Sequence, residues 1–394
     1  MTPAPPPPAH ARVWAEVDLE AVRANVRTIL ATADVPLLAV VKADAYGHGA
    51  VEVGRAALEA GARGLGVATA AEAWELRQAG IGAPIQVLGS FLPGDELDLA
   101  VRAGATLTLH DAEDLERVRA AAWRARRRLP VELKVDVGMH RHGVALPQAA
   151  ALLRRVRAEG TVRLDGLMTH LPCAAGSDLA ATRVRAAAFG AFAEAARQRG
   201  LAPARVHAAA SAALFRVPES RLTQVRAGIA VVGLDPTGCL AEVGVRLRPA
   251  LALRARVMRV RAVPRGAAVG YGGTWVASRP SRVAIVGAGY ADGVPYPLSG
   301  RGGRVLIQGR PCPLVGTVMM DYCLVDVTDL PRLPQPGDVC TLAGADGFAR
   351  IGVEELAAQA GLIPYALTCG LGRRVGRVVR GARASAPAPV LRVA

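Results

Sequence analysis

The chain of 394 residues is 52% hydrophobic and carries 48 basic against 33 acidic side chains, a formal net charge of +15. This length and apolar content suffice for two domains, or for one large barrel with a smaller domain, and argue against a disordered chain. The arginines are scattered along the whole chain with few aromatic residues among them, which argues against a nucleic-acid-binding protein.

Neither end of the chain has the features of a targeting signal or a membrane anchor. Residues 1–11 are rich in proline and residues 385–394 in alanine and proline, so both segments are predicted to be flexible tails. No run of about 18 apolar residues is present, and the six cysteines show no CxxC spacing. We therefore expect a cytoplasmic protein with reduced cysteines, no membrane contact and no bound metal.

Apolar runs alternate with alanine-rich segments of helical period between residues 12 and 244. The predicted strands are 36–42, 64–69, 84–89, 105–110, 131–137, 163–170 and 204–209, and a last unit contains VRAGIA (225–230). The predicted helices are 50–60, 70–79, 111–128, 146–158 and 178–199. Such alternation indicates an α/β fold with a parallel sheet covered by helices, here a closed TIM-type (β/α)8 barrel.

The pattern changes after residue 245, where short strand-like runs are separated by glycine and proline turns. These runs are 254–263, 281–290, 303–316 and 321–330. One helix, at 352–362, interrupts them. We predict a mainly antiparallel β domain over residues 245–384.

Only two of the 48 basic residues are lysines, Lys42 and Lys134. Arginine supplies charge as well as lysine does, but its guanidinium cannot act as a neutral amine nucleophile. The active site of a closed parallel barrel lies at the carboxyl ends of its strands, where both lysines are expected. We interpret both as candidates for positions at which an amine must react.

A lysine amine that faces a pocket can hold pyridoxal phosphate as a Schiff base. The phosphate of such a cofactor needs backbone N–H groups and hydroxyls, which the last two units of a barrel commonly supply. In this chain those units contain Ser211 and the peptide N–H groups of Gly228 and Ile229. A serine in an alanine-rich stretch is otherwise a helix cap, so these residues alone leave its function open.

Nine segments, in the same order along the chain, resemble the motifs of the alanine racemase family. They are AVVKADAYGHG (39–49), LKVDVGMHRHG (133–143), GLMTH (166–170), SAAL (211–214), VRAGIA (225–230), VGYGGTW (269–275), GYADG (289–293), VGTVMMD (315–321) and RRVGR (373–377). The resemblance spans nearly the whole chain. It implies a pyridoxal-phosphate-dependent racemase made of a barrel and a β domain.

The resemblance implies how the barrel holds the cofactor. Lys42 matches the lysine that binds pyridoxal phosphate, and Arg226 matches the arginine that faces the pyridine nitrogen, with His170 behind it. An arginine there leaves the ring nitrogen unprotonated, which makes the cofactor a weaker electron sink and suppresses side reactions. The other cofactor contacts are expected at Tyr46, Leu88, Arg141, Ser211, Gly228 and Ile229.

The resemblance also implies a role for the second lysine. Lys134 matches a lysine that is carbamylated in many members, as N6-carboxylysine, and thereby becomes an anion. That anion positions Arg141, which reaches the phenolic oxygen of the cofactor and the carboxylate of the substrate. Both lysines would then need a neutral amine, which arginine does not offer.

Racemisation requires a proton to leave one face of Cα and return to the other, so two bases must flank this carbon. Lys42 matches one base. Tyr271 matches the other, which in the family comes from the β domain of the partner subunit. Met320 and Tyr290 match residues at the substrate entrance, Met320 close to the carboxylate. The resemblance therefore implies a homodimer with shared active sites.

Four positions depart from the family's pattern. Ala210 and Asp44 each replace a frequent asparagine, Thr317 replaces an arginine, and Arg373 stands where some members have a tyrosine that contacts the phosphate. Neither of the two expected bases is among these positions.

The expected function is the interconversion of L-alanine and D-alanine, which supplies D-alanine for peptidoglycan. The alternative is a racemase of the same family that acts on serine, lysine or ornithine. A decarboxylase of similar architecture would use an acidic partner for the pyridine nitrogen and a catalytic cysteine, so Arg226 argues against it. A non-catalytic barrel that binds pyridoxal phosphate would lack the β domain.

Overall fold

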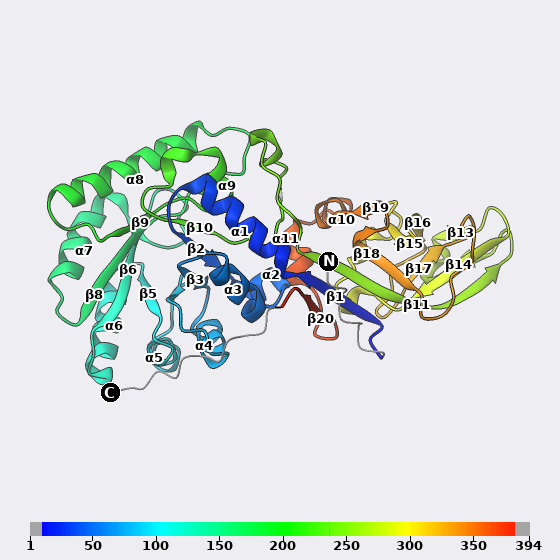
Figure 1. The fold of residues 1–394 in the computed structure, drawn as a ribbon, viewed down its shortest axis with the longest axis horizontal. Helices are drawn as coiled ribbons and strands as arrows, with labels where there is room; N and C mark the ends of the chain where they lie inside the picture. Colours follow the sequence, from blue (N-terminus) through cyan, green and yellow to red (C-terminus); the bar gives the residue numbers. More distant parts are fainter. Residues whose placement is uncertain (1–9, 236, 383–394) are drawn as a thin grey trace. The chain divides into compact units, whose positions relative to one another are not determined.

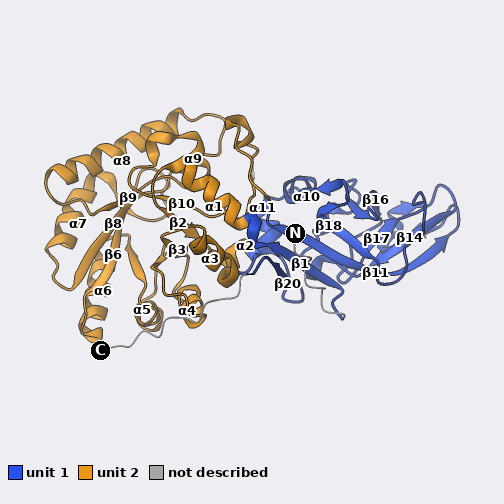
Figure 2. Cartoon of the chain, viewed as in Figure 1, with its two compact units in different colours: residues 1–21, 47–49, 249–382 blue, residues 22–46, 50–248, 383–394 orange. Residues whose placement is uncertain are grey.

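The computed structural model describes residues 10–235 and 237–382, which form two compact units (Figure 2). The barrel unit contains residues 22–46 and 50–248, apart from position 236, and the β unit contains residues 10–21, 47–49 and 249–382. Apart from residues 10 and 11, the tails predicted at 1–11 and 385–394 lie outside the described residues.

The barrel unit is built on one parallel sheet with the strand order β10-β2-β3-β4-β5-β6-β8-β9. Its strands are β2 (Leu37–Val40), β3 (Gly64–Val67), β4 (Ile85–Val87), β5 (Thr106–Leu109), β6 (Leu129–Asp136), β8 (Val162–Met168), β9 (Arg205–His207) and β10 (Val225–Ala227), and β7 (Val144–Ala145) pairs with β6. Backbone hydrogen bonds link the two edges, from Arg226 N to Ala209 O (3.0 Å) and from Thr223 N to Val206 O (3.0 Å). The predicted (β/α)8 barrel is confirmed.

Burial explains why these short segments form a barrel. Every residue of β2, β3 and β5 is buried, as in a parallel sheet covered by helices on one side and by its own packed interior on the other. The helices, drawn around the strands in Figure 1, are α1 (Leu19–Ala33), α3 (Ala50–Glu59), α4 (Ala70–Gln78), α5 (Asp95–Arg102), α6 (Ala112–Ala125), α7 (Leu146–Ala158), α8 (Ala180–Gln198) and α9 (Ser211–Arg216). Of these, α1, α5 and α9 are helices that the sequence patterns did not predict.

The β unit is a nine-stranded sheet with the order β19-β18-β15-β16-β17-β14-β11-β1-β20, and β18 also pairs with β11. Its strands are β1 (Val13–Asp18), β11 (Leu251–Val263), β14 (Ser281–Val286), β15 (Arg304–Ile307), β16 (Arg310–Val315), β17 (Cys323–Asp326), β18 (Val339–Asp346), β19 (Ala349–Ile351) and β20 (Gly376–Arg380). A hairpin of β12 (Ala268–Val269) and β13 (Trp275–Val276) forms a separate sheet. The pairings are antiparallel except that of β1 with β20, so the mainly antiparallel domain is confirmed.

Two details of the β unit differ from the sequence predictions. The barrel domain was expected to begin at residue 12, but residues 13–18 form β1, a strand that was not predicted and that pairs with β11 and β20. Val13 and Ala255 are partners in this sheet, and local sequence patterns carry no information on so distant a pairing. One helix was expected, whereas α10 (Val353–Ala360) is followed by α11 (Pro364–Cys369).

Short 3-10 turns complete the two units: η1 (Pro218–Ser220), η2 (Ala241–Val243), η3 (Tyr271–Gly273), η4 (Tyr290–Asp292) and η5 (Tyr296–Leu298). None of the described helices is both long enough and apolar enough to cross a bilayer.

Candidate active site

The residues predicted for the cofactor site belong to the barrel unit and lie at or just beyond the carboxyl ends of its strands. They are Lys42 after β2, Leu88 after β4, Lys134 and Arg141 in and after β6, His170 after β8, Ser211 after β9, and Arg226, Gly228 and Ile229 in and after β10. The barrel topology brings these distant segments to one face. Tyr271, Tyr290 and Met320 belong to the β unit.

The chain leaves β2 through an unusual turn. The short helix α2 (Lys42–Gly47) is left-handed, with φ between 50° and 56° at residues 43–46. A left-handed turn costs roughly 1–2 kcal/mol for each residue that is not glycine, so it persists only where the surroundings impose it. Ala45 N donates to Val41 O within the turn (2.8 Å). The turn carries Tyr46 away from the end of β2.

Tyr46, Ser211 and Gly228 meet at the carboxyl end of β10. A methyl group added at Gly228 would collide with the hydroxyl and ring of Tyr46, so only glycine lets the two come this close. Ser211 Oγ accepts from Gly228 N (3.2 Å) and from Ala230 N (3.4 Å). A hydroxyl and backbone N–H groups at the start of a turn make a suitable cradle for an anion.

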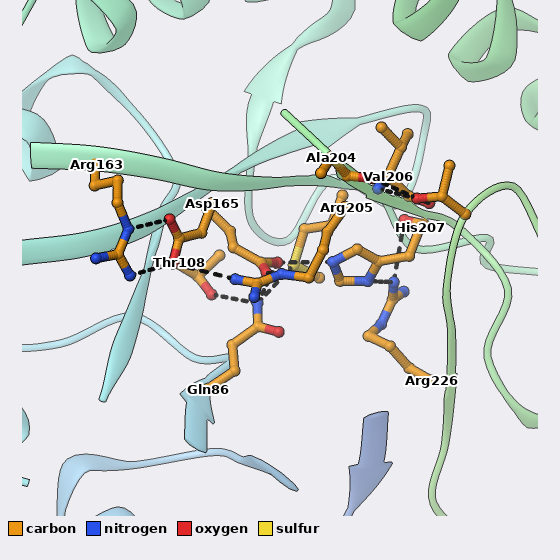
Figure 3. Close-up of polar contacts among 12 residues, drawn as sticks. Gln86, Thr108, Arg163, Asp165, Ala204, Arg205, Val206, His207 and Arg226 are labelled. Carbon is orange, nitrogen blue, oxygen red and sulfur yellow. Dashed lines mark hydrogen bonds and ion pairs between the residues drawn. The ribbon is translucent and has the colours of Figure 1, made fainter. Parts of the chain in front are cut away.

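Arg226 is buried in the barrel and is fixed by four hydrogen bonds. Nη1 donates to Nδ1 of His207 (2.5 Å) and to the His207 carbonyl (3.1 Å), as Figure 3 shows. Nη2 donates to the carbonyls of Thr169 (2.6 Å) and Ala208 (3.2 Å). These bonds occupy all four Nη hydrogens, and Nε–H has no hydrogen-bond acceptor among the described residues. The guanidinium thus has one donor left for a ligand.

Behind His207 lies a buried carboxylate. Glu132 Oε2 accepts from Nε2 of His207 (2.7 Å) and from Gln86 Nε2 (2.7 Å), and Oε1 accepts from Arg205 Nε (3.2 Å). Gly166 leaves the space for this carboxylate, because a methyl group there would overlap it. Figure 3 shows Gln86, Arg205, His207 and Arg226 converging on this network.

The charges within this network are set by burial and by the partners. Burial opposes ionisation of Glu132, but His207, Arg205 and Arg226 outweigh it and lower the pKa of the carboxyl. Burial lowers the pKa of His207, and Nδ1 can accept the bond from Arg226 only in the neutral imidazole. Burial also lowers the pKa of Arg226, to about 10, so its guanidinium stays protonated at neutral pH. The result is a carboxylate, a neutral imidazole and a guanidinium in series.

Positive charge predominates around Lys134. Burial and the charges of Arg141 and Arg226 lower the pKa of Lys134 to about 8, so a substantial fraction of its amine is neutral near that pH. Burial and the same arginines, with both lysines, lower the pKa of His170 to about 3. The positive charge that lowers the pKa values of Lys134 and His170 also favours the binding of an anionic ligand.

The loop that carries Arg141 is shaped by Asp136 at the end of β6. Its carboxylate accepts from the backbone N–H groups of Gly138 (3.0 Å), Met139 (2.8 Å) and His140 (3.0 Å). Although partial burial opposes ionisation, these bonds lower the pKa of Asp136. The side chain of Arg141 itself is exposed.

In the β unit, Tyr271 begins the η3 turn with an exposed side chain. Thr317 Oγ1 donates to the Tyr271 carbonyl (3.1 Å) and lies 3.3 Å from Thr274 Oγ1. The threonine that replaces the family's arginine thus supports the backbone of Tyr271 and adds no charge.

A second set of contacts holds the segments of Tyr290 and Met320. Tyr290 N donates to Met319 O (3.0 Å). Asp292 Oδ2 accepts from Gly289 N (2.9 Å), and Arg374 joins Asp292 (Nε to Oδ1, 3.0 Å) to Asp321 (Nη1 to Oδ1, 2.8 Å). These bonds fix two exposed side chains, Tyr290 and Met320, on neighbouring backbone segments.

The other departures from the family pattern have smaller local effects. Ala210 precedes α9 as its N-cap residue and makes no side-chain cap, unlike an asparagine. Asp44 Oδ1 accepts from Ala50 N (2.8 Å) at the start of α3. Nothing in the structure explains Arg373.

Sequence reasoning missed Glu132, Gln86 and His207, and it placed His170 directly behind Arg226. The imidazole that bonds Arg226 is His207. His170 is neutral near neutral pH, because burial and the charge of Arg226 lower its pKa to about 3. A histidine and a glutamate inside apolar strands, in VELKVDV (131–137) and ARVHAA (204–209), were the available signal, because buried polar groups need partners.

Comparisons with known proteins identify the family of the chain. Residues 17–236 match the family model described as alanine racemase, N-terminal domain, and residues 250–379 match that of the C-terminal domain. The alanine racemase of Symbiobacterium thermophilum is 42% identical over 370 residues, which are 93% of this chain and 97% of that protein.

Two solved structures extend the comparison. The alanine racemase of D-cycloserine-producing Streptomyces lavendulae is 39% identical, with a TM-score of 0.89 over 96% of this chain and 99% of that one. The alanine racemase of Bartonella henselae, with covalently bound pyridoxal phosphate, is 28% identical, with a TM-score of 0.82 over 94% of this chain and 100% of that one. Both family models and these relatives together cover nearly all of the described residues, and the chain therefore belongs to the alanine racemase family.

Proposed function

We propose that this chain interconverts L-alanine and D-alanine with pyridoxal phosphate bound to Lys42. The observation that carries the proposal is the one donor of Arg226 that remains open, Nε–H, while the other donors of the guanidinium are fixed. This donor lies at the same face of the barrel as Lys42, which follows β2. A pyridine nitrogen without a proton is an acceptor that suits this donor. Family membership supports the same cofactor.

The barrel residues fit this cofactor. Ser211 Oγ, the N–H groups of Gly228 and Ile229, and Tyr46 would hold the phosphate, and Leu88 would line the site. The predominance of positive charge around Lys134 favours a phosphate and a carboxylate. When bound, pyridoxal phosphate supplies an electron sink that withdraws charge from Cα of the amino acid.

Arg226 would keep the pyridine nitrogen unprotonated, because a guanidinium does not release its proton near neutral pH. Glu132 and His207 support that role, since the carboxylate stabilises the positive charge of Arg226 and the imidazole fixes the orientation of the guanidinium. A moderate electron sink suits racemisation, which requires the proton to return to the same carbon.

Two bases would move the proton. Lys42 Nζ would serve one face of Cα, and the phenol of Tyr271 from the partner subunit would serve the other. Tyr271 is 74% exposed in the single chain, which leaves its hydroxyl accessible to another subunit. The proposal therefore includes a homodimer with two shared sites, in which Tyr290 and Met320 narrow the entrance for a small substrate.

Lys134 would be carbamylated and would orient Arg141 toward the substrate carboxylate. A carbamate forms from a neutral amine, and the lowered pKa of Lys134, about 8, supports such a reaction under mild conditions. We further propose a cytoplasmic enzyme that supplies D-alanine for peptidoglycan. All six cysteines lie among the described residues as free thiols, as in reducing compartments.

The test combines cofactor trapping with hydrogen exchange at Cα. Reduction of the holoenzyme with borohydride should bleach its visible absorption and leave the pyridoxyl group on Lys42. Incubation with L-alanine in deuterated water should give loss of optical rotation and α-deuteration together. Label on another residue, or rotation lost without α-deuteration, would refute the proposal. Turnover of serine, lysine and ornithine, measured in parallel, separates alanine specificity from a broader racemase.

A further inference from the structure

The carboxylate of Glu72 connects the ends of two neighbouring barrel strands. Glu72 stands at the third position of α4 and forms a capping box with Thr69, whose Oγ1 accepts from Glu72 N (3.3 Å). Oε2 accepts from Thr69 N (3.3 Å) and Ala68 N (2.7 Å), just beyond β3. Oε1 accepts from Ala43 N (2.6 Å), just beyond β2. The last bond is not part of a capping box, which involves only the first turn of its own helix.

The donor of this last bond, the N–H of Ala43, lies at a critical place in the chain. Ala43 follows Lys42 directly and begins the left-handed turn that ends at Tyr46. The phosphate contact at Tyr46 and the amine of Lys42 therefore sit at opposite ends of one short turn. Whatever fixes the first peptide of this turn also fixes the separation and direction of these two groups.

We propose that Glu72 is a positioning residue for Lys42. Its carboxylate holds the peptide that follows Lys42 against the end of β3, so that Lys42 Nζ and the Tyr46 hydroxyl meet the two ends of one cofactor molecule. This inference rests on the proposed function, because the cofactor is what gives the spacing its value. Glu72 acts through the backbone and does not touch the reacting atoms.

A carboxylate is required at this position because both of its oxygens accept hydrogen bonds from N–H groups. In Glu72→Gln, one of these oxygens becomes an NH2 group. In either orientation of the amide, that group faces an N–H donor at Ala43 or at Ala68. At least one bond is lost and two donors oppose each other, while the size of the side chain is unchanged.

The test compares Glu72→Gln with two matched variants in the full-length protein. Thr69→Ala removes the capping hydroxyl but leaves the three bonds of the carboxylate. Glu75→Gln removes the same charge from the next exposed position of α4, where the side chain has no hydrogen bond or ion pair with the described residues. The readouts are the rate of pyridoxal phosphate loss on dilution, the yield of borohydride label on Lys42, and the melting temperature of the cofactor-free protein.

We expect Glu72→Gln to lose cofactor about tenfold faster than the wild type and to give less label on Lys42, as for one lost hydrogen bond and one unsatisfied donor. Thr69→Ala and Glu75→Gln should resemble the wild type in both readouts. Wild-type cofactor retention in Glu72→Gln overturns the proposal. An equal loss in Thr69→Ala also overturns it, because helix capping alone would then explain the effect.

A measurement on the unaltered protein covers the case in which Glu72→Gln does not fold. Ala43 is exposed, so its amide should exchange rapidly with solvent unless the carboxylate binds it. We expect slow amide exchange at Ala43 in the wild type, and fast exchange there contradicts the inference. Failure of the proposed function gives a different result from failure of this inference. A wild-type protein that carries no cofactor on Lys42 refutes the proposed function, whatever the behaviour of Glu72→Gln.

Discussion

The carboxylate of Glu132 and the imidazole of His207 form a fully buried pair, with 2.7 Å between Oε2 and Nε2. The carboxylate accepts a hydrogen bond from Nε2–H, which leaves Nδ1 as the acceptor for Arg226 at 2.5 Å. A buried acid thus determines the tautomer of the histidine, and the histidine determines the direction of the guanidinium. The charge of Arg226 is balanced inside the barrel and does not depend on a ligand.

We expect Glu132→Gln to destabilise the protein while preserving its fold. The amide keeps the size of the side chain but removes the negative charge that raises the pKa of Arg226. A buried donor is left poorly satisfied, so the free energy of unfolding should fall by about 1–3 kcal/mol. Chemical denaturation at neutral pH measures the change. Glu113→Gln removes an exposed carboxylate and should cost less than about 1 kcal/mol. Equal effects of the two variants would contradict this reading of the pair.

A second expectation concerns acid stability and His110. Burial is the main cause that lowers the pKa of His110 from 6.5 to about 4. Because the folded pKa is depressed, the unfolded chain binds more protons between these two values, and stability is lost as the pH falls through this window. His110→Phe keeps a ring and should make the melting temperature less dependent on pH between 6.5 and 4. If the melting temperatures of wild type and variant depend on pH in the same way, His110 does not contribute to the loss of stability in acid.

Local sequence pattern was sufficient for the barrel but not for the turn that matters most. Strands such as β2 and β5 are buried throughout, and they appear in the sequence as apolar runs. Their positions and the location of Lys42 could therefore be predicted. No propensity favours four left-handed residues outside glycine, and the turn at residues 43–46 depends on tertiary contacts such as that of Glu72.

Contacts between residues that are distant in sequence could not be predicted either. Val13 pairs with Ala255, and Glu132 reaches His207 from another strand. Periodicity shows that such residues are buried but not which residues they meet. The resemblance to the family supplied the candidate site, yet it could not show that His207 is the imidazole bonded to Arg226.

The close approach of Gly228 to Tyr46 leads to a third expectation. In Gly228→Ala the new methyl group would collide with the hydroxyl and ring of Tyr46, so the tyrosine has to move out of the phosphate cradle. We expect weaker binding of pyridoxal phosphate, and overpacking should lower the free energy of unfolding by about 1–3 kcal/mol. Titration of the cofactor-free protein, followed by absorbance, measures the affinity. Gly190→Ala in α8 places a methyl group in open space and should bind the cofactor normally. Unchanged affinity in Gly228→Ala would remove Tyr46 and Gly228 from the phosphate site.

Carbamylation of Lys134 can be tested without assaying activity. The lowered pKa of its amine, about 8, leaves more neutral amine near neutral pH than an ordinary lysine has. Protein equilibrated with carbon-13 bicarbonate should therefore show a carbamate signal by NMR that weakens as the pH falls below this value. Lys134→Arg should lack the signal, because a guanidinium is not neutral under these conditions. A wild-type protein without the signal would exclude the carbamate and leave Arg141 without its proposed partner.

The assignment of Tyr271 predicts an asymmetric loss of function. Tyr271→Phe removes the phenol and retains the ring, so removal of the α-proton should become much slower for L-alanine than for D-alanine. The loss from removing a general base is about 10²–10⁴-fold. Exchange of the α-proton into deuterated water, measured separately from each enantiomer, gives the two rates. Equal losses in both directions would contradict a two-base arrangement with Tyr271 on one face and Lys42 on the other.

Mixed dimers show which subunit supplies the phenol. Lys42→Ala and Tyr271→Phe chains each lack one base and should be nearly inactive alone. If Tyr271 acts on the partner's site, one site of the mixed dimer combines an intact Lys42 with an intact Tyr271, so mixing the two chains under exchange conditions restores activity. If Tyr271 acts within its own chain, every site lacks a base and mixing restores nothing. Activity recovered above that of either variant alone therefore tests the shared site directly.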